Sequence, residues 1–491
     1  MKRRWGLVVA CLATAAILAP LGWLWWNSLI PAQYSVTEMG YADYGGGPTA
    51  SDMAGMHHDA VSIDTLTVGT DRPADVEYEL TARQERFTLA SGRSVDGYTL
   101  NGESPGPVIR ATQGDLVEVT VTNDSVPDGI TLHWHGVDMP NAMDGVAGVT
   151  QDAVMEGESF TYRFLADQVG TYWYHSHQVS HEQVIGGLFG TLVVDPPPGG
   201  SSTTAADVDK VAVVHIYGGV RTVNGEEGDV PVEAQPGDLV RVRVVNTDNG
   251  PMSVWTSGAP YRVVAVDGYD LNEPDPVAGQ ATTVTAGGRA DLEVEVPASG
   301  VRIELGGNAA LLIGPGAEAV PATEAPREFV DFLTYGAPQP LPFDPADADR
   351  HFEYNVDRRP GFLDGRPGLW WTINGHLYPD VPMFTVAEGD IVVMRISNTS
   401  GDVHPMHLHG HHAVVLSRDG EDATGSPWWV DSLNVLDGET YEIAFLADNP
   451  GVWLDHCHNL PHAKQGLLAH LMYEGFTTPF VMGGEAHNEP E

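Results

Sequence analysis

A pattern that recurs three times constrains this fold more than any other feature of the sequence. In each copy, a turn containing Gly-Asp feeds a stretch in which apolar and polar residues alternate, and alternation with a period of two predicts a half-buried strand. Copies separated by the length of a whole domain indicate duplicated domains rather than a solenoid. The copies are Pro107–Asn123, Val232–Asn246 around Gly237-Asp238, and Pro382–Asn398 around Gly389-Asp390.

The repeats continue beyond that strand. A second Gly-containing turn opens another alternating strand, and each of these strands leads to a further glycine. No long helical period follows Val61, and two Pro-, Gly- and Ala-rich linkers separate the copies. The sequence therefore predicts an all-β chain with three consecutive β-sandwich domains, at residues 61–197, 208–315 and 328–478. The turns are Gly157-Glu158, Gly287-Gly288 and Gly438-Glu439, the glycines Gly170, Gly300 and Gly451, and the linkers 196–207 and 314–328.

Aligning the three repeats places paired histidines in the first and third copies only. Residues two apart on a strand point to the same face, so each His-x-His pair presents two imidazoles to one cavity. Four pairs supply eight imidazoles, which suit copper and exceed the four ligands of a usual zinc site. We therefore expect a three-copper cluster between domains 1 and 3. The pairs are His133 and His135, His175 and His177, His407 and His409, and His456 and His458.

Cys457 lies between the last two histidines and points to the other side of its strand. There His404 and His462 can complete a trigonal His₂Cys site, the ligand set of electron-transfer copper. The chain has only one other cysteine, Cys11, in an N-terminal apolar run, so no structural disulfide is expected. The axial position falls near Leu467, and the lack of a thioether there raises the copper potential.

The N-terminus carries Lys2-Arg3-Arg4 and then an uncharged apolar run from Trp5 to Trp26. The run is long enough to span a bilayer, and the basic cluster keeps its start cytoplasmic. Residues 1–30 are therefore predicted to be a single-pass anchor that places the domains on the extracytoplasmic side. The alternative is a signal peptide whose cleavage releases a secreted protein.

Residues 31–60 have no apolar period and are rich in Gly, Ala, Asp and Met. This composition predicts a flexible tether that lifts the domains off the membrane. Within it, the thioethers and imidazoles of Met53, Met56, His57 and His58 are suited to bind copper, although a plain polar linker explains the same composition.

The chain is strongly acidic, with 67 Asp and Glu against 24 Lys and Arg and a formal net charge of −43. This balance argues against nucleic acid and anionic lipid as partners. It is typical of a well-solvated surface, and it also favours cationic substrates such as metal ions. Oligomeric state leaves no signature in the pattern.

Four motifs together resemble those of the multicopper oxidases, the three-domain family that includes laccases and bacterial cuprous oxidases. They are His-Trp-His-Gly at 133–136, His-Ser-His at 175–177, His-Pro-Met-His-Leu-His at 404–409 and His-Cys-His-x-x-x-His at 456–462. The resemblance covers about residues 61–478 and implies that the sandwiches are cupredoxin-like Greek keys. It also implies four copper ions. The ligands would be His404, Cys457 and His462 for type 1, His133 and His407 for type 2, and His135, His175, His177, His409, His456 and His458 for the type 3 pair.

The family mechanism follows from the same resemblance. A small reducing substrate gives single electrons to the type 1 copper, the electrons pass through Cys457 to its neighbours, and O₂ is reduced to two waters at the cluster. Asp144, in Met143-Asp144-Gly145-Val146, matches an acid that helps to deliver protons in related enzymes. The sequence departs from many bacterial relatives at Ala463, where they carry an acid, and it lacks the Met-rich insertion of cuprous oxidases.

Three functions compete on this reading. The first is an O₂-reducing oxidase of phenols, aromatic amines or low-valent metal ions. The second is a copper-dependent nitrite reductase, which the paired His-x-His sets disfavour. The third is a membrane-tethered copper buffer, which would not need a cysteine between two cluster histidines. The loops that build the donor pocket vary freely on a shared scaffold, so the donor itself is left open.

Overall fold

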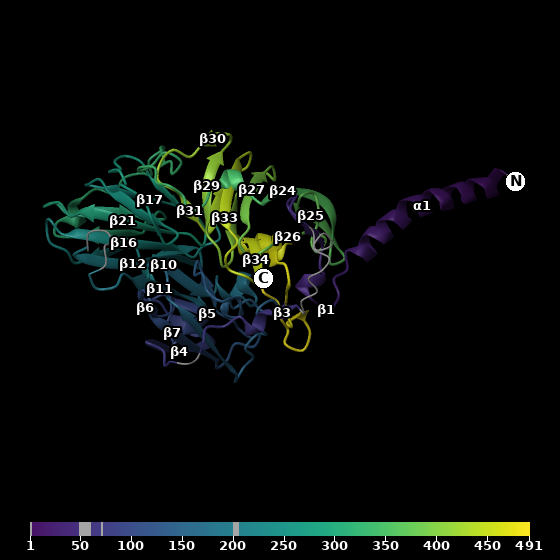
Figure 1. The fold of residues 1–491 in the computed structure, drawn as a ribbon, viewed down its shortest axis with the longest axis horizontal. Coiled ribbons are helices and arrows are strands. Elements are labelled where there is room, and N and C mark those ends of the chain that lie inside the picture. Colours follow the sequence, from purple (N-terminus) through teal and green to yellow (C-terminus); the bar gives the residue numbers. More distant parts are fainter. Residues whose placement is uncertain (1, 49–59, 70–71, 200–205) are drawn as a thin grey trace.

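The computed structural model describes residues 2–48, 60–69, 72–199 and 206–491. Within them, three β-sandwiches lie around a common centre, with domain 1 in blue, domain 2 in teal and domain 3 in green to yellow (Figure 1). Each domain contacts the other two: domain 2 hydrogen bonds to both neighbours, and domain 1 bonds to domain 3. The predicted all-β fold of three cupredoxin-like sandwiches is confirmed.

Domain 1 has two four-stranded sheets packed around one apolar core. Its strands follow the predicted alternation, since Val117, Val119 and Val121 are fully buried whereas the residues between them face outward. One sheet has the order β5 (Ser94–Leu100), β4 (Val76–Thr88), β7 (Leu116–Asn123) and β9 (Ser159–Leu165). The other has the order β6 (Val108–Thr112), β11 (Phe189–Asp195), β10 (Gly170–His175) and β8 (His133–His135).

Domain 2 repeats this plan with a larger outer sheet and its own core. The seven-stranded sheet has the order β14 (Glu226–Glu227), β13 (Val220–Val223), β12 (Val208–Tyr217), β16 (Leu239–Asn246), β21 (Arg289–Glu295), β18 (Arg262–Val266) and β19 (Tyr269–Asp270). The five-stranded sheet has the order β15 (Asp229–Val232), β23 (Ala310–Ile313), β22 (Val301–Glu304), β17 (Met252–Ser257) and β20 (Thr282–Val284).

Domain 3 holds the third copy and the largest core cluster. One sheet has the order β2 (Tyr41–Asp43), β26 (Pro382–Val386), β35 (Leu468–Tyr473), β34 (Val452–Cys457), β28 (His404–Leu408) and β32 (Ser432–Val435). The other has the order β25 (Arg366–Ile373), β24 (Arg350–Leu363), β27 (Ile391–Asn398), β33 (Thr440–Leu446), β29 (Ala413–Arg418) and β30 (Glu421–Asp422), with β31 (Trp429–Val430) paired to β29.

Short elements complete the described part of the chain. Two small ladders pair β1 (Gln33–Tyr34) with β37 (Met482–Gly483) and β3 (Val61–Ser62) with β36 (Phe476–Thr477). The α-helices are α1 (Lys2–Asn27), α2 (Ser180–Gln183) and α3 (Leu460–Lys464). The 3₁₀ turns are η1 (Val36–Glu38), η2 (Ile63–Thr65), η3 (Asn141–Met143), η4 (Ala317–Ala319) and η5 (Pro345–Asp347).

The prediction of a flexible tether over residues 31–60 is wrong for its first part. Strand β2 pairs in parallel with β26 and becomes the edge of the inner sheet of domain 3. Val36 and Met39 of the arm at residues 33–43 are buried in the core of domain 3. Two buried apolar residues are too few to produce a periodic pattern in the sequence, which is why the sequence predicts a flexible arm. Met53, Met56, His57 and His58 lie outside the described residues.

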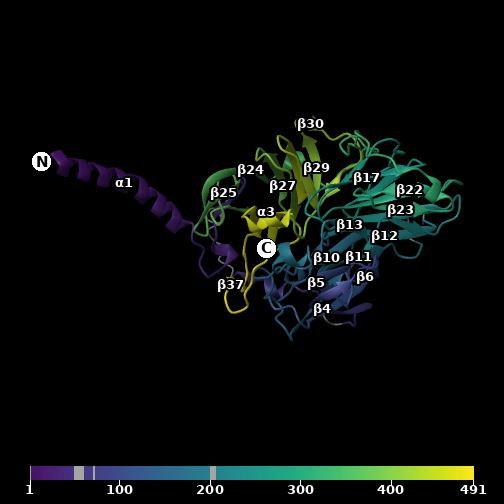
Figure 2. The ribbon, with the colours of Figure 1, turned by 180° about the vertical axis from the view of Figure 1, so that it is seen from behind.

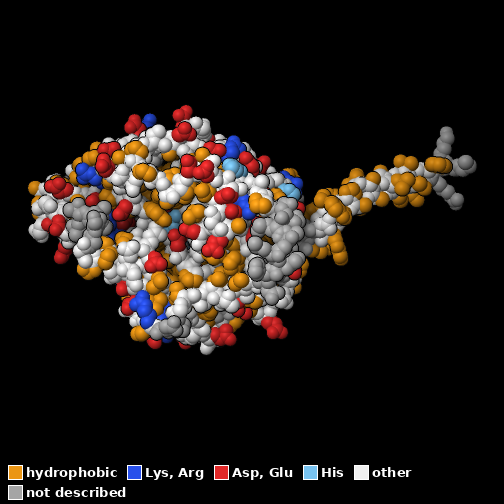
Figure 3. Space-filling view, viewed as in Figure 1, with side chains coloured by type: hydrophobic (Ala, Val, Ile, Leu, Met, Phe, Trp, Pro, Cys, Tyr) orange, Lys and Arg blue, Asp and Glu red, His pale blue; other side chains and the backbone are white. Residues whose placement is uncertain are grey.

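Helix α1 stands away from the body as a long rod covered with hydrophobic side chains (Figures 1 and 3). Its segment Trp5–Asn27 is long and apolar enough to cross a membrane. The root of α1 rests on the hairpin of β24 and β25, where the backbone N–H of Gly365 donates to Ser28 Oγ at 3.1 Å. The backbone N–H of Ile30 donates to the Asp364 carboxylate at 3.4 Å. The domains therefore sit directly at the end of the helix.

Candidate metal centre

Equivalent strands of domains 1 and 3 carry the histidine pairs. In domain 1, β8 pairs with β10 so that His133 lies opposite His175. In domain 3, β28 pairs with β34 so that His407 lies opposite His456. The buried side chains of each strand fix how the strands pair. A shift of one residue in this pairing would turn every imidazole to the other face of the sheet.

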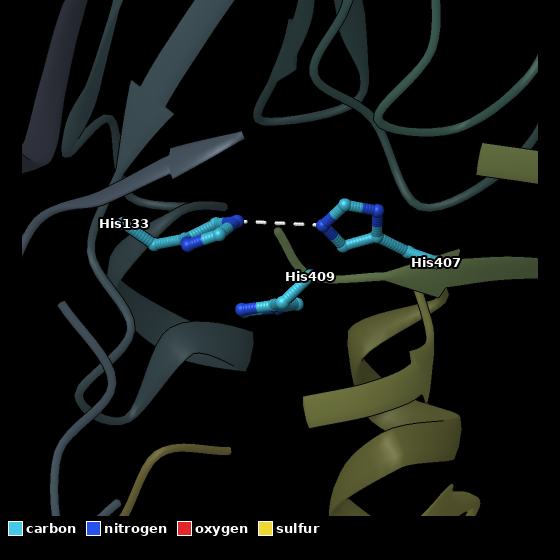
Figure 4. A group of neighbouring side chains, drawn as sticks. All are labelled: His133, His407 and His409. Atoms are coloured by element: carbon cyan, nitrogen blue, oxygen red, sulfur yellow. Dashed lines mark hydrogen bonds between the residues drawn. The ribbon is translucent and has the colours of Figure 1, made fainter. Parts of the chain in front are cut away.

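The two domains bring their eight imidazoles into one buried cavity. The Nε2 atoms of His133 and His407 lie 3.3 Å apart across the domain interface, and His409 stacks beside His133 (Figure 4). The Nε2 atoms of His409 and His456 are 3.2 Å apart. The imidazoles form three groups of three, and within each group the ligand nitrogens lie within 4.8 Å of one another. The groups are His133, His407 and His409; His135, His175 and His458; and His177, His409 and His456. All eight side chains are at most 1% exposed.

The cavity fits metal ions because several of the imidazole Nε2 atoms that surround it lack protein partners. Among the described residues, the buried Nε2 atoms of His135, His175, His177 and His458 accept or donate no hydrogen bond. Buried polar atoms are normally paired, so four orphans around one cavity indicate an ion. Carbonyl oxygens accept from Nδ1 of several rings, which leaves the Nε2 lone pair pointing into the cavity. These carbonyls belong to Ser176, Pro490 and Asp431, bonded to His175, His177 and His407.

Burial keeps these imidazoles neutral, as metal ligands must be. It lowers the pKa of His175, and the neighbouring histidines lower it further. The same causes lower the pKa of His177 and of His458 to about 3 in each case. Copper binding at neutral pH therefore displaces few protons from this cluster.

A second centre lies on the opposite face of β34. Cys457 Sγ is 3.5 Å from His404 Nδ1 and 3.8 Å from His462 Nδ1, and the two nitrogens are 3.3 Å apart. Bonds of about 2.0–2.3 Å to one metal give such separations in a trigonal site. Leu467, expected near the axial position, is fully buried in the same core cluster as Cys457. Burial raises the pKa of the Cys457 thiol far above its usual range, so the thiolate needs a bound cation.

Domain 1 does not repeat this second centre. Ser176, aligned with Cys457, donates to the Gln183 side chain at 2.6 Å. His181, aligned with His462, lies on α2 with its imidazole beside the exposed Glu182. A polar network therefore replaces the His₂Cys set.

Asp144 bridges the two domains from inside the cluster. Its carboxylate accepts from His409 Nδ1 at 3.0 Å and lies 3.2 Å from His133 Nδ1. The side chain is 3% exposed. The structure thus places the predicted acid against one histidine of each domain, where it sets the orientation of both rings.

Replacing Asp144 by Asn is expected to lower copper affinity by about 10- to 100-fold. The amide keeps only one oxygen, so either His133 or His409 would face an N–H₂ group in place of a carboxylate oxygen. Metal analysis and the spectrum of the type 2 copper measure the change. Asp138→Asn is the matched control, since Asp138 lies 3.3 Å from His412, a histidine outside the predicted ligand set. Equal copper contents in the two variants would rule out the proposed role of Asp144.

Sequence reasoning missed a group of charged residues beside the histidine cluster. One of them, Arg289, comes from domain 2. The Arg289 guanidinium reaches the Asp431 carboxylate at 2.6 Å and lies 3.4 Å from His135 Nδ1. His412 also contacts Asp431, at 3.2 Å, and its pKa is raised to about 10 because Asp138 and Asp431 outweigh the effect of burial. Gly136 has φ +80, and a Cβ there would collide with Arg289 and Asp431, which explains the glycine of the His-Trp-His-Gly motif.

Sequence reasoning also missed Glu491. Its carboxylate is buried, accepts from Ser180 Oγ at 2.7 Å and lies 3.2 Å from Nδ1 of His456. Backbone pairing holds this segment in place, since Val179 N–H donates to the Glu489 carbonyl at 2.6 Å. A carboxylate therefore stands beside the cluster although residue 463 is Ala.

Glu491→Ala is expected to lower copper occupancy by about tenfold, because the buried His456 loses the carboxyl oxygen that lies 3.2 Å from its Nδ1. Glu491→Gln keeps an acceptor oxygen and should retain most of the copper. Metal analysis together with the absorption of the type 3 pair compares the two variants. A loss of the same size in both would assign Glu491 a purely electrostatic role.

Comparison with known proteins agrees with this geometry. Family models described as "Multicopper oxidase" match residues 81–199 and 345–475. The multicopper oxidase MmcO of Mycobacterium tuberculosis is 30% identical over 87% of this chain and 92% of the relative. Laccase-1 of Botryotinia fuckeliana is 30% identical over 78% of this chain and 80% of the relative.

Solved structures give the same result. A multi-copper oxidase from Pseudomonas thermotolerans superposes with a TM-score of 0.66 at 29% identity, covering 81% of this chain and 98% of the other. The buried histidine groups fit the four copper ions of that family. The chain belongs to the multicopper oxidases and is a copper-dependent oxidoreductase that uses O₂.

Proposed function

We propose that this protein oxidises a phenol, an aromatic amine or a low-valent metal ion at the His404, Cys457 and His462 centre and reduces O₂ to water at the histidine cluster. The observation that carries this proposal is the position of Cys457. It belongs to one centre, whereas its two chain neighbours, His456 and His458, belong to the other. Bound copper supplies the one-electron transfers and the reduction of O₂.

The chain itself provides the electron route. The two centres lie on opposite faces of β34, so a covalent path of a few bonds connects them. We assign His404, Cys457 and His462 to the type 1 ion and His133 and His407 to the type 2 ion. The type 3 pair would be held by His135, His175, His177, His409, His456 and His458.

Asp144 has the role of holding and passing protons in this proposal. It touches His133 and His409 and is the acid of domain 1 that lies in the cluster. A positioned carboxylate can exchange protons with water that reaches the cavity. The same contacts make Asp144 a positioning residue for the two rings.

We propose that α1 is retained as a single-pass anchor with the domains on the extracytoplasmic side. The apolar span and the exposed Trp25 and Trp26 at its end are typical of a segment that ends at a membrane surface. Cleavage and secretion are the alternative, and the molecular mass of the mature protein in membrane and culture fractions distinguishes them.

The competing functions are disfavoured by the same sites. A nitrite reductase needs a single three-histidine site, whereas eight imidazoles surround this cavity. A copper buffer needs no cysteine between two cluster histidines. Oxygen uptake by the copper-loaded protein with Cu(I), Mn(II), Fe(II) and substituted phenols tests the proposal. A blue protein that consumes no oxygen with any donor would contradict it.

A further inference from the structure

A cavity of about 700 Å³ lies between the root of α1 and helix α3. Its walls come from the segment after α1, the β24–β25 hairpin, the loop after His462 and the last residues of the chain. None of the predicted copper ligands lines it. A volume of this size holds a small organic ligand.

One wall of the cavity begins where α1 ends. Ile30, Pro31 and Ala32 line it, and they follow the last residue of α1, Asn27, by only a few positions. An extended chain covers about 3.5 Å per residue, so with α1 across a bilayer this wall lies within about 20 Å of the membrane surface. Figure 2 shows β24, β25 and α3 on the side of the body from which α1 departs.

The opposite wall adjoins the type 1 centre. Trp370 lines the cavity, whereas Trp371 packs on His462 and His404 with ring centroids 4.5 and 4.8 Å apart. Neighbours on a strand face opposite sides, so β25 presents Trp370 to the cavity and Trp371 to these rings. Gln465 also lines the cavity and accepts from Trp371 Nε1 at 3.1 Å.

The lining combines apolar side chains and hydroxyl groups with charged side chains, the last being Asp364, Arg366, Lys464, Glu489 and Glu491. Ile30, Leu363, Trp370 and Leu468 supply apolar and aromatic contacts. The hydroxyls of Tyr34 and Tyr378 lie 2.6 Å apart and can bond to a phenolic ring. A ligand with an aromatic hydroxyl head and an apolar tail fits the hydroxyl and apolar parts of this lining.

We propose that this cavity binds a hydroquinone with an apolar side chain, which reaches it from the membrane and gives its electrons to the type 1 centre. This inference rests on the proposed oxidase function and the retained anchor. Each hydroquinone loses two electrons and two protons and becomes a quinone, so two hydroquinones and one O₂ give two quinones and two waters. By holding the cavity next to the membrane, the anchor would favour electron donors that are dissolved in the lipid.

Kinetics of the full-length, copper-loaded protein in lipid vesicles test the proposal. Decyl-hydroquinone should show a kcat/KM at least about tenfold above that of methyl-hydroquinone, because its tail is buried. Leu363→Asp should lower kcat/KM for decyl-hydroquinone by at least about tenfold and leave the blue band, which reports the type 1 centre, unchanged. Leu369→Asp is the control, since Leu369 is 56% exposed on the same hairpin outside the cavity. Equal effects of both variants would overturn the proposal.

A binding measurement separates this inference from the oxidase function. A redox-inert dimethoxybenzene with a diazirine-bearing alkyl chain should label peptides around Leu363–Trp370 and Gln465–Leu468, even in protein that consumes no oxygen with any donor. Excess unlabelled decyl-dimethoxybenzene should suppress this labelling. Labelling confined to α1, or spread evenly over the surface, would show that the cavity does not hold the ligand.

Discussion

Cys457→Ser is expected to abolish the blue colour and the turnover of the copper-loaded protein together. The thiolate is the strong ligand of the His₂Cys centre, and its backbone joins the two centres. Residues that act as one unit lose nearly all activity when one is removed, so kcat should fall by at least about 1000-fold. Absorption spectra and oxygen uptake measure both effects.

The control for this variant is Ser176→Ala, at the aligned position of domain 1. Ser176 also lies between two cluster histidines, but it bonds to Gln183 and belongs to no metal group. Colour and turnover should survive there. Turnover that persists in Cys457→Ser would mean that electrons enter the cluster by a route other than β34.

Arg289→Met is expected to destabilise the protein and to deplete the type 2 copper. Arg289 is 1% exposed and faces both Asp431 and Asp267. Removing one partner of a buried ion pair costs about 3–5 kcal/mol, because the remaining charge is uncompensated. Asp431 also accepts from His407 through its backbone carbonyl, so its displacement disturbs a predicted type 2 ligand. Thermal denaturation and copper analysis follow the two effects.

Arg243→Met separates stability from metal binding. Arg243 is a second buried arginine of domain 2, and it pairs with Asp209 and Asp291. It contacts no predicted ligand. We expect a comparable loss of thermal stability with normal copper content. Copper loss of equal size in both variants would show that Arg289 acts only through the fold.

The strands and the histidine pairs could be predicted because their signals are local. Alternation marks a strand such as Leu116–Asn123, and two histidines separated by one residue share a face wherever that strand lies. Alignment of the repeats then located the centre between domains 1 and 3, since domain 2 has no pairs. The assignment of each ligand to a copper type remains a prediction.

The contacts of Arg289 and Glu491 could not be predicted, because each depends on docking between segments far apart in the chain. Arg289 begins an ordinary strand of domain 2, and nothing near it in sequence indicates a partner at Asp431. Glu491 reaches His456 because its segment pairs with residues 179 and 180, far away in the chain. The structured arm at residues 33–43 escaped prediction for the same reason.

Strand β2 has a consequence for how the protein matures. It precedes domain 1 in the chain but completes a sheet of domain 3, whose strands are synthesised after those of domains 1 and 2. During synthesis this strand appears before its partner and must wait, unpaired, until β26 follows. A shortened protein that begins at residue 61 would leave the edge of β26 open to pairing with other chains. Soluble versions for biochemical work should therefore start before Tyr41, ahead of the apparent boundary of the first domain.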